Sequence, residues 1–569
     1  MRNDPKEQRN QIGEPKHRDQ VAEFRRQLTA WRADKTGAGE NARHEGAGVH
    51  SYFSGRASRG DPEFTGRPGV GSMKVSRKQF LQTVAAAPLQ ASQSPKPAAS
   101  RTQRPPNVLI LMSDQHRPDF MTCAGRDLVP TPHLDRIAEN GVRFTNAYCP
   151  YPVCVGSRTS FLSGLYAHHH GAVNNELSLD WRTRTIAHHF RDHGYVTGLI
   201  GKMHLNQPHL HGFDFHLGFN DWLMYLGPKT QLYANDIASH QHGANFFKTV
   251  LDHGSGFPEL PHLWRGKSPW AGKVQLNDKV ASDLEPEDHV DAFVARESTR
   301  FLSQYKDTPF FLVAGFLKPH PPFHPPADWA AKYPMDKVQL RPVGDSSQYP
   351  KHIQNRIRNT QGLGEHRLRS GLAGYLGNLA FLDVCVGQVY KSLEELGLAS
   401  NTIVIYTSDH GDMLGDHGLY QKFVLYEASV GVPMIVSFPK SIPRGRASKA
   451  LVEYIGIYPT VAELAGTGAP KGIDAKSFAA YARNPDHAGP PAAFSEYDLG
   501  AGVPQYMART QRYKYIYNDG EIDELYDWEA EPGENVNRAK EPGMKRTRDQ
   551  LRDQLFAWYN PERNPYRRK

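Results

Sequence analysis

Four short apolar runs in this chain each end in charged or imidazole side chains. The runs are Val108–Met112, Tyr195–Ile200, Pro309–Ala314 and Thr402–Thr407. Segments with helical periodicity separate them, which is typical of an α/β fold with a large, mostly parallel sheet flanked by helices. Ligands of such sheets bind outside the carboxyl ends of the strands. The sequence therefore predicts that residues far apart in the chain line one crevice.

Two sets of polar side chains lie at or after these strand ends. The first set offers oxygen and imidazole ligands for one divalent cation: Asp114, Gln115, Asp409 and His410. The second set consists of cations or potential cations: Lys202, His204, His320 and Lys422. A metal and several basic groups neutralise the charge of a transferred sulfate or phosphate group, and a nearby histidine can protonate the departing alkoxide. Together they predict hydrolysis of an anionic ester.

Cys154 is the candidate nucleophile. It follows the proline-rich turn 149–152 and precedes a helix predicted from about Ser157. The unpaired amides at a helix N-terminus favour both a nucleophile and a bound anion. Arg158 lies four residues further on and can direct a planar guanidinium toward the same anion.

These motifs resemble the type I sulfatases of the alkaline phosphatase superfamily. The resemblance spans roughly residues 107–559 and rests on five segments: 149–164, Gly201–His204, Ser408–Gly415, Met507–Tyr517 and Asp523–Asp527. Asp-Gln after the first strand and Asp-His after the late strand look like the branch of choline sulfatases and phosphonate monoester hydrolases. The arylsulfatase branch more often has Asp-Asp and Asp-Asn.

The resemblance implies that a maturation enzyme oxidises Cys154 to formylglycine. One hydroxyl of its hydrate, held on the metal, attacks sulfur, and the other then helps to expel sulfate. By the same resemblance, Asp114, Gln115, Asp409 and His410 match the metal ligands, while Arg158, Lys202 and His204 match groups that hold the sulfate and the hydrate. His320 and Lys422 match groups near the leaving oxygen. The implied metal is calcium, with manganese as the alternative because His410 supplies an imidazole.

One position departs from the family's maturation motif, Cys-x-Pro-x-Arg or occasionally Cys-x-Ala-x-Arg. This chain has Gly156 at the middle place. Glycine loosens the extended conformation that proline fixes. Two alternatives to sulfate-ester hydrolysis therefore remain: a phosphonate or phosphodiester hydrolase of the same superfamily, and a non-catalytic binder of anionic glycans in which Cys154 is not matured.

The 569 residues divide into three predicted parts. Residues 1–104 have the composition of a disordered extension, with a signal-like segment starting at Met73 that predicts export to the periplasm or the exterior. Without a functional signal, the protein would be cytoplasmic. Residues 105–463 form the predicted catalytic domain and 464–569 a smaller α+β subdomain with an antiparallel sheet. Within these parts, 346–359 is predicted to be a loop, and helices are predicted over 375–396 and 546–559.

Composition excludes several other classes of protein. The formal net charge of +8 comes from 68 basic and 60 acidic residues spread over the chain, so no nucleic-acid surface is predicted. No run reaches the ~18–20 consecutive apolar residues of a membrane span. Four cysteines without a C-x-x-C pair predict neither a disulfide framework nor a structural zinc site. The expected partners are thus a sulfated small molecule or glycan and the maturation enzyme.

Overall fold

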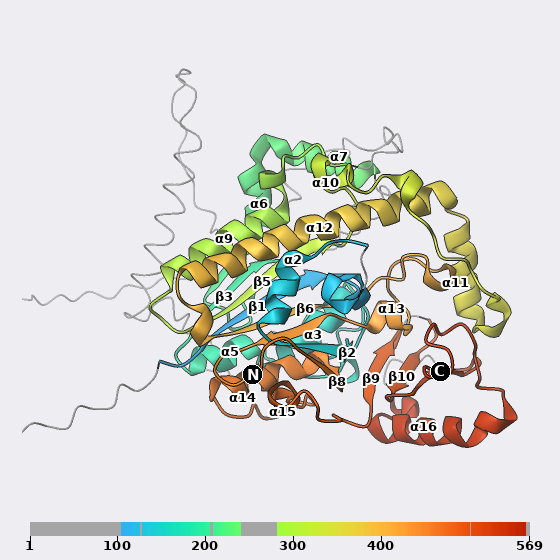
Figure 1. Ribbon diagram of the computed structural model, residues 1–569. Helices are drawn as coiled ribbons and strands as arrows, with labels where there is room; N and C mark the ends of the chain where they lie inside the picture. The colour runs from blue at the N-terminus through green and yellow to red at the C-terminus, as the bar shows by residue number, and fades with distance from the viewer. Residues whose placement is uncertain (1–103, 126–127, 205–208, 240–280, 501, 565–569) are drawn as a thin grey trace, which may run out of the picture. The chain divides into compact units, whose positions relative to one another are not determined.

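The computed structural model describes residues 104–125, 128–204, 209–239, 281–500 and 502–564. The predicted extension, up to residue 103, and its signal-like segment from Met73 lie outside the described residues. Residues 104–569 form one compact unit. This unit contains two sheets, a large one of eight strands and a small one of four (Figure 1).

The large sheet has the strand order β4-β3-β5-β1-β6-β7-β2-β8. Its strands are β1 (Asn107–Asp114), β2 (Val142–Tyr148), β3 (Val196–Gly201), β4 (Phe215–Leu217), β5 (Phe310–Pro319), β6 (Thr402–Ser408), β7 (Met434–Ser437) and β8 (Arg446–Glu453). Only β7 pairs antiparallel with its neighbours. The mostly parallel α/β fold predicted from the sequence is confirmed.

The four strands predicted to end in functional residues are neighbours in the centre of this sheet. They follow one another as β3, β5, β1 and β6, and all pair in parallel. All residues of these strands are buried, which explains why their sequences are continuous apolar runs rather than alternating ones. Because Ser113 pairs with Ser408, the next residues, Asp114 at the end of β1 and Asp409 just after β6, lie at the same level of the sheet.

Helices cover both faces of the large sheet (Figure 1). One face carries α2 (Pro132–Glu139), α9 (Val290–Gln304) and α12 (Glu365–Glu395), and the other carries α3 (Cys154–Ser163), α5 (Ile186–Asp192) and α14 (Ile457–Ala465). Shorter or peripheral helices are α4 (Ala167–His170), α6 (Phe219–Leu226), α7 (Thr230–Ser239), α10 (Ala327–Ala330), α11 (Lys351–Gln361), α13 (Glu427–Val430) and α15 (Ala479–Arg483).

The long helix α12 is a core element, and it begins ten residues before the predicted 375–396. Among the described residues it is the one helix long and apolar enough to cross a membrane, and 83% of its most apolar window is buried inside the protein. Gly374 sets its distance from the loop that follows β5. A Cβ at this position would lie 2.0 Å from the carbonyl oxygen of Phe323. Glycine therefore lets the backbone after β5 pack directly on the helix.

The small sheet is antiparallel and has the order β12-β11-β10-β9. Its strands are β9 (Ala493–Tyr497), β10 (Gln505–Arg509), β11 (Tyr513–Asn518) and β12 (Glu524–Asp527), and α16 (Lys545–Trp558) packs on it. This sheet shares a hydrophobic cluster with Tyr151 and Val153, immediately before Cys154. The C-terminal part therefore packs against the segment between β2 and α3 that leads into the candidate nucleophile. The predicted domain boundary at 464 stays a prediction.

One predicted local feature is wrong. The segment predicted as a loop over 346–359 contains α11, a polar helix that buries only Ile353 and Ile357, so its apolar periodicity is weak. Thr131 is the N-cap residue of α2, but its side chain makes no cap hydrogen bond. The carboxylate of Asp383 on α12 accepts the amides of His133 and Leu134 instead, at 3.2 and 2.9 Å. A residue 250 positions away replaces the local cap.

Asp383 gives the fold a specific pH dependence. Burial raises the pKa of this carboxyl to about 7 from 3.8. Its contribution to stability is therefore complete below about pH 4 and is lost as the pH rises through 7, because the folded state then holds a desolvated charge. We expect Asp383→Asn to gain stability relative to the wild type between pH 4 and 8, on the order of 1–4 kcal/mol. Denaturant unfolding across this range measures the difference.

The exposed residue Asp486 provides the matched control. Asp486→Asn should follow the wild-type pH profile. A free-energy difference between Asp383→Asn and the wild type that stays constant from pH 4 to 8 would contradict the assignment.

Candidate active site

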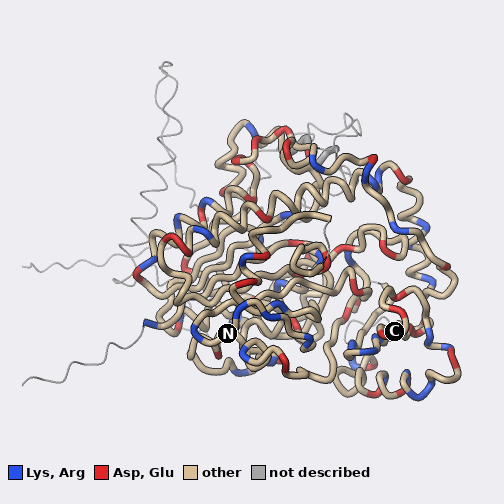
Figure 2. Tube along the Cα trace, in the orientation of Figure 1, with Lys and Arg blue, Asp and Glu red and all other residues tan. Residues whose placement is uncertain are grey.

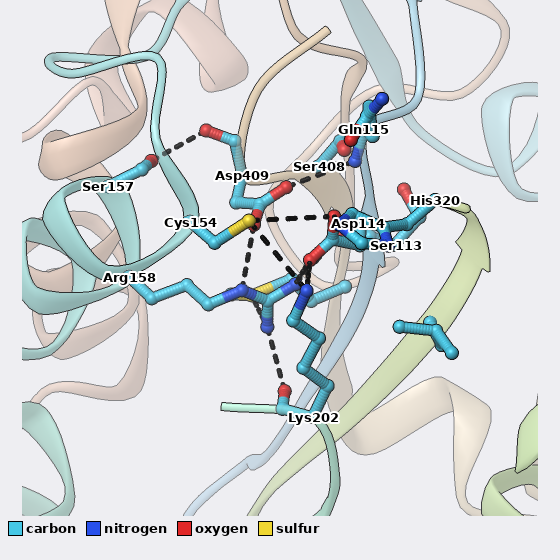
Figure 3. A network of polar contacts seen from close by, with 12 residues as sticks. Ser113, Asp114, Gln115, Cys154, Ser157, Arg158, Lys202, His320, Ser408 and Asp409 are labelled. Carbon is cyan, nitrogen blue, oxygen red and sulfur yellow. Dashed lines mark hydrogen bonds and ion pairs between the residues drawn. The ribbon is translucent and has the colours of Figure 1, made fainter. Parts of the chain in front are cut away.

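The predicted site residues gather at the carboxyl ends of β1, β3, β5 and β6. Figure 3 shows Asp114, Lys202, His320 and Asp409 converging on the sulfur of Cys154 at the start of α3. The helix begins at Cys154, three residues before its predicted start at Ser157, so the candidate nucleophile is itself the first helical residue. Asp114, Asp409, His410 and Cys154 are all at most 1% exposed. The site is thus a buried cluster of charges.

Arg158 joins the two central carboxylates. Its Nη2 lies 2.8 Å from Asp114 Oδ2 and its Nε 2.8 Å from Asp409 Oδ2. Its Nη1 donates to the carbonyl of Lys202 at 2.7 Å. A planar guanidinium suits this arrangement because its donors point in fixed directions. Arg158 thereby fixes the relative positions of β1, β3 and β6 at the site.

A second cation, Lys202, completes the pairing of Asp114. Lys202 Nζ lies 2.6 Å from Asp114 Oδ2 and 3.7 Å from Cys154 Sγ. Burial alone would raise the pKa of Asp114, but Lys202, His320 and Arg158 outweigh it and hold the pKa well below its usual range. Asp114 is therefore an anion available to a metal ion.

The donors fit a divalent cation. One ligand atom from each of Asp114, Cys154, Asp409 and His410 lies within 4.8 Å of the others. Two carboxylates and an imidazole suit calcium or a transition ion, and the Nδ1 of His410 is 2.9 Å from the carbonyl oxygen of Gly411, so its Nε2 faces the cluster.

Gln115 contacts its neighbours in a way that the sequence did not predict. Its Oε1 accepts a hydrogen bond from Lys422 Nζ at 2.6 Å, and its Nε2 donates to Asp412. Its backbone amide donates to Asp409 Oδ1 at 3.1 Å, with the residue in the left-handed region at φ 70°. Gln115 therefore links Lys422 to the carboxylates, and its amide oxygen is next to a cation in this structure.

Cys154 is surrounded by positive charge. Its Sγ lies 3.2 Å from His410 Nε2, and the side chain of His204 also hydrogen-bonds to it. Burial raises the pKa of the thiol, but Lys202, Lys422 and His410 overcome this effect and hold the pKa well below 9.0. The same field favours any anionic oxygen near this Cβ, including those of a bound ester.

The family follows from the chain's match to known proteins. The model described as Sulfatase matches residues 106–467, and the model described as N-sulphoglucosamine sulphohydrolase, C-terminal, matches 415–560. The chain belongs to the sulfatase family. The resemblance inferred from the motifs is confirmed, and this sulfatase is a sulfuric ester hydrolase by family.

The relatives are distant in sequence, but the match covers most of this chain and most of each relative. The chain is 28% identical to an arylsulfatase of Clostridium perfringens over 79% of this chain and 94% of the relative. It is 27% identical to a choline-sulfatase of Rhizobium meliloti, with coverages of 77% and 83%. A phosphonate monoester hydrolase of Agrobacterium radiobacter has the same fold, with a TM-score of 0.66 at 22% identity over 80% and 95% of the two chains.

The structure adds residues to the sulfatase site that the sequence had not assigned. Asp412 is fully buried and accepts from Gln115 and from the amide of Leu414. Ser157 Oγ donates to the carbonyl of Asp409 at 2.6 Å. Asp412 lies only three residues after Asp409, in the same motif, so the sequence could have indicated it as a further site carboxylate. The sequence could not have indicated Ser157, because its contact with Asp409 depends on where α3 packs.

The histidines of residues 168–170 are not part of the metal cluster. They lie in the short helix α4, and His168 pairs with Glu496 of β9 at 2.8 Å. His169 pairs with Asp474 at 2.8 Å. His168 also stacks on Tyr559, with ring centres 4.0 Å apart. This tract therefore connects the nucleophile region to the C-terminal part.

Gly156, the departure from the maturation motif, has a packing role in the folded protein. A Cβ at this position would lie 2.5 Å from Cδ1 of Tyr151. Tyr151 is fully buried, and its hydroxyl donates to the carbonyl of Val173 at 2.7 Å, so the ring has little freedom to move. A larger residue at 156 would displace either Tyr151 or the first turn of α3.

We expect Gly156→Ala to destabilise the protein by about 1–3 kcal/mol because it overpacks a well-filled site. Thermal or denaturant unfolding measures the loss. In a Tyr151→Ala background the same substitution should cost much less, since the clashing ring is gone. Gly344→Ala is the control, because a Cβ there meets nothing within 4 Å. Equal costs of Gly156→Ala in both backgrounds would contradict the packing role.

Proposed function

We propose that this sulfatase hydrolyses a sulfate ester of a small molecule or glycan and releases inorganic sulfate. The nucleophile is formylglycine derived from Cys154, assisted by one divalent cation, calcium or manganese. The observation that carries the proposal is the arrangement around Cys154 Sγ, where His410, Lys202 and Asp114 lie at 3.2, 3.7 and 3.9 Å. A candidate nucleophile, metal ligands and anion-binding cations thus share one buried centre.

The charge balance of the site suits an anionic substrate. Three buried carboxylates, Asp114, Asp409 and Asp412, face three cations, Arg158, Lys202 and Lys422. Asp114, Gln115, Asp409 and His410 would hold the divalent cation, which supplies charge neutralisation of the sulfate and eases loss of a proton from a bound hydroxyl. The loaded site is then net positive, as binding of a sulfate ester requires.

The protein's own groups have separable tasks. Sγ of Cys154 stands in for the formylglycine oxygens, which are attached to the same Cβ and supply the attack on sulfur and the later release of sulfate. Lys202 and His204 lie against this position and would hold the sulfuryl oxygens. His204 Nδ1 is buried and has no hydrogen-bond partner among the described residues, so it can donate to or accept from a substrate.

His320 would supply the proton to the departing alkoxide. Its Nδ1 lies 2.7 Å from the carbonyl oxygen of Pro321, which orients the ring, and its Nε2 lies 3.9 Å from Asp114 Oδ1. Burial, together with Lys202 and Lys422, lowers the pKa of His320 to about 4. A bound anionic ester opposes these cations and raises the pKa again, so protonation of this imidazole is coupled to substrate binding.

A phosphodiester or phosphonate ester is the second candidate substrate. The Asp, Gln, Asp, His set and the basic groups around it suit phosphoryl transfer as well as sulfuryl transfer. We also propose that the enzyme is exported, because residues 76–81 of the signal-like segment from Met73 resemble a twin-arginine signal with one arginine replaced by lysine, which suits an enzyme exported already folded.

Parallel assays decide between the substrates. We expect the matured enzyme to hydrolyse 4-nitrophenyl sulfate faster than bis-4-nitrophenyl phosphate. Cys154→Ala should lower sulfate release by more than roughly 10³-fold because the nucleophile is lost. Cys123→Ala, at a half-buried cysteine outside the site, should retain activity. The mass of the peptide containing Cys154 should show the aldehyde.

Two results would overturn parts of the proposal. A phosphodiester rate that dominates by orders of magnitude would reject sulfate esters as the main substrate. An unmodified Cys154 thiol in fully active enzyme would reject formylglycine as the nucleophile.

Removal of the metal ion should abolish activity, and addition of calcium or manganese should restore it. Because the ion binds the folded protein, the added cation should also raise the melting temperature of the wild type. Asp409→Ala should lose this shift, since it removes a carboxylate that faces the other ligands. The surface variant Asp486→Asn should keep it. A cation-induced shift of equal size in Asp409→Ala would place the ion elsewhere.

A further inference from the structure

Lys422 reaches the active site from a loop with an unusual backbone. The residues on either side, Gln421 and Phe423, are both in the left-handed region, with φ of 64° and 78°. Neither is glycine, and a side chain beyond Cα makes this backbone conformation strained. This conformation persists only where surrounding contacts hold it. The residues that provide those contacts decide where the ammonium of Lys422 lies.

Arg356 on α11 binds this loop directly. Its Nη1 donates to the carbonyl of Phe423 at 2.5 Å, and its Nη2 donates to the carbonyl of Lys422 at 2.9 Å. One planar guanidinium thus binds two consecutive carbonyls, which precede and follow the Cα of the strained residue Phe423. Its carbon also lies 5.7 Å from the centre of the Phe423 ring. Lysine could not reproduce this fork.

The other end of Lys422 lies within the active centre. Its Nζ donates to Gln115 Oε1 at 2.6 Å and lies 5.5 Å from the same Phe423 ring. Phe423 is therefore in contact range of both cations, one on the backbone side and one on the site side. Gln115 in turn contacts Asp409 and Asp412. A shift of the loop would move the Lys422 ammonium away from these groups.

Arg356 also has a neighbour in the small sheet. Tyr497 of β9 hydrogen-bonds to it, and the Tyr497 ring lies 6.2 Å from that of Phe423. The guanidinium thus bridges α11, the loop of Lys422 and the C-terminal sheet. Among the described residues, its contacts do not include Cys154 or the site carboxylates, and its direct route to the active site is the loop of Lys422.

We propose that Arg356 is a positioning residue that holds the Lys422 loop in its strained conformation and so fixes the Lys422 ammonium in the active site. The proposal rests on the proposed ester hydrolysis for its readout. It adds a residue from a helix outside the sheet to the determinants of turnover. Its chemical consequence is placement of a positive charge, with no step of bond making or breaking.

A double-mutant cycle tests the proposal. We expect Arg356→Ala to lower kcat/KM by roughly 10–100-fold, and Arg356→Lys to lower it less because one carbonyl contact survives. In a Lys422→Ala background, Arg356→Ala should cause no more than about a threefold further loss, because the group it positions is absent. Guanidinium ion added to Arg356→Ala should restore part of the activity. Arg358→Ala, at an exposed arginine of the same helix, is the control.

A merely structural role would give a different result. Arg356→Ala would then lower the melting temperature and reduce kcat/KM by the same factor whether residue 422 is lysine or alanine, and guanidinium would not rescue it. Equal factors in the two backgrounds overturn the proposal.

The cycle also separates this proposal from the proposed function. The assays use whichever ester the wild type hydrolyses. A preference for phosphodiesters would therefore reject sulfate hydrolysis, but the double-mutant cycle could still be measured with the phosphodiester. Calorimetric titration of inorganic sulfate into the Cys154→Ala protein gives a readout without turnover. Arg356→Ala should weaken sulfate binding there by the same factor as Lys422→Ala, and unchanged binding in Arg356→Ala alone would overturn the proposal.

Discussion

The active site depends on one buried guanidinium between two carboxylates. Arg158 is completely excluded from solvent and pairs with Asp114 of β1 and with Asp409, which follows β6. Two carboxylates this close repel each other in a low-dielectric interior, so they could not both be charged without a cation between them. Because Arg158 lies on α3, the same contact fixes Cys154, one turn earlier, against both aspartates.

The parts of the molecule around this centre support it from different sides. The small sheet packs its apolar residues on Tyr151 and Val153, and Gly156 leaves room for the Tyr151 ring. These contacts hold the start of α3 in place. On the opposite face, Gly374 lets the loop after β5, which carries His320, pack closely on α12. Figure 2 shows acidic and basic residues interspersed over the described chain.

Sequence reasoning predicted the elements whose signal is local. β1, β3, β5 and β6 were recognised because strands buried on both faces are continuous apolar runs. The sequence does not predict α11 because this helix buries only two isoleucines, and it does not predict the side chain that caps α2 because Asp383 comes from the distant helix α12. The same limit applies to the site. Asp114, Lys202, His320, Asp409 and His410 were placed together by strand topology, whereas the contact of Gln115 with Lys422 depends on a loop conformation that no periodicity predicts.

The sequence by itself determined the fold class, the family, the candidate nucleophile and the edge of the sheet where the site lies. Each of these follows from short local motifs and from the order of the parallel strands. Tertiary structure alone decided how the charges pair. It placed Arg158 between the aspartates, Tyr151 against Gly156 and Arg356 on the carbonyls of the Lys422 loop. These contacts join residues distant in the chain through directional hydrogen bonds and close packing, which depend on three-dimensional distance and not on sequence spacing.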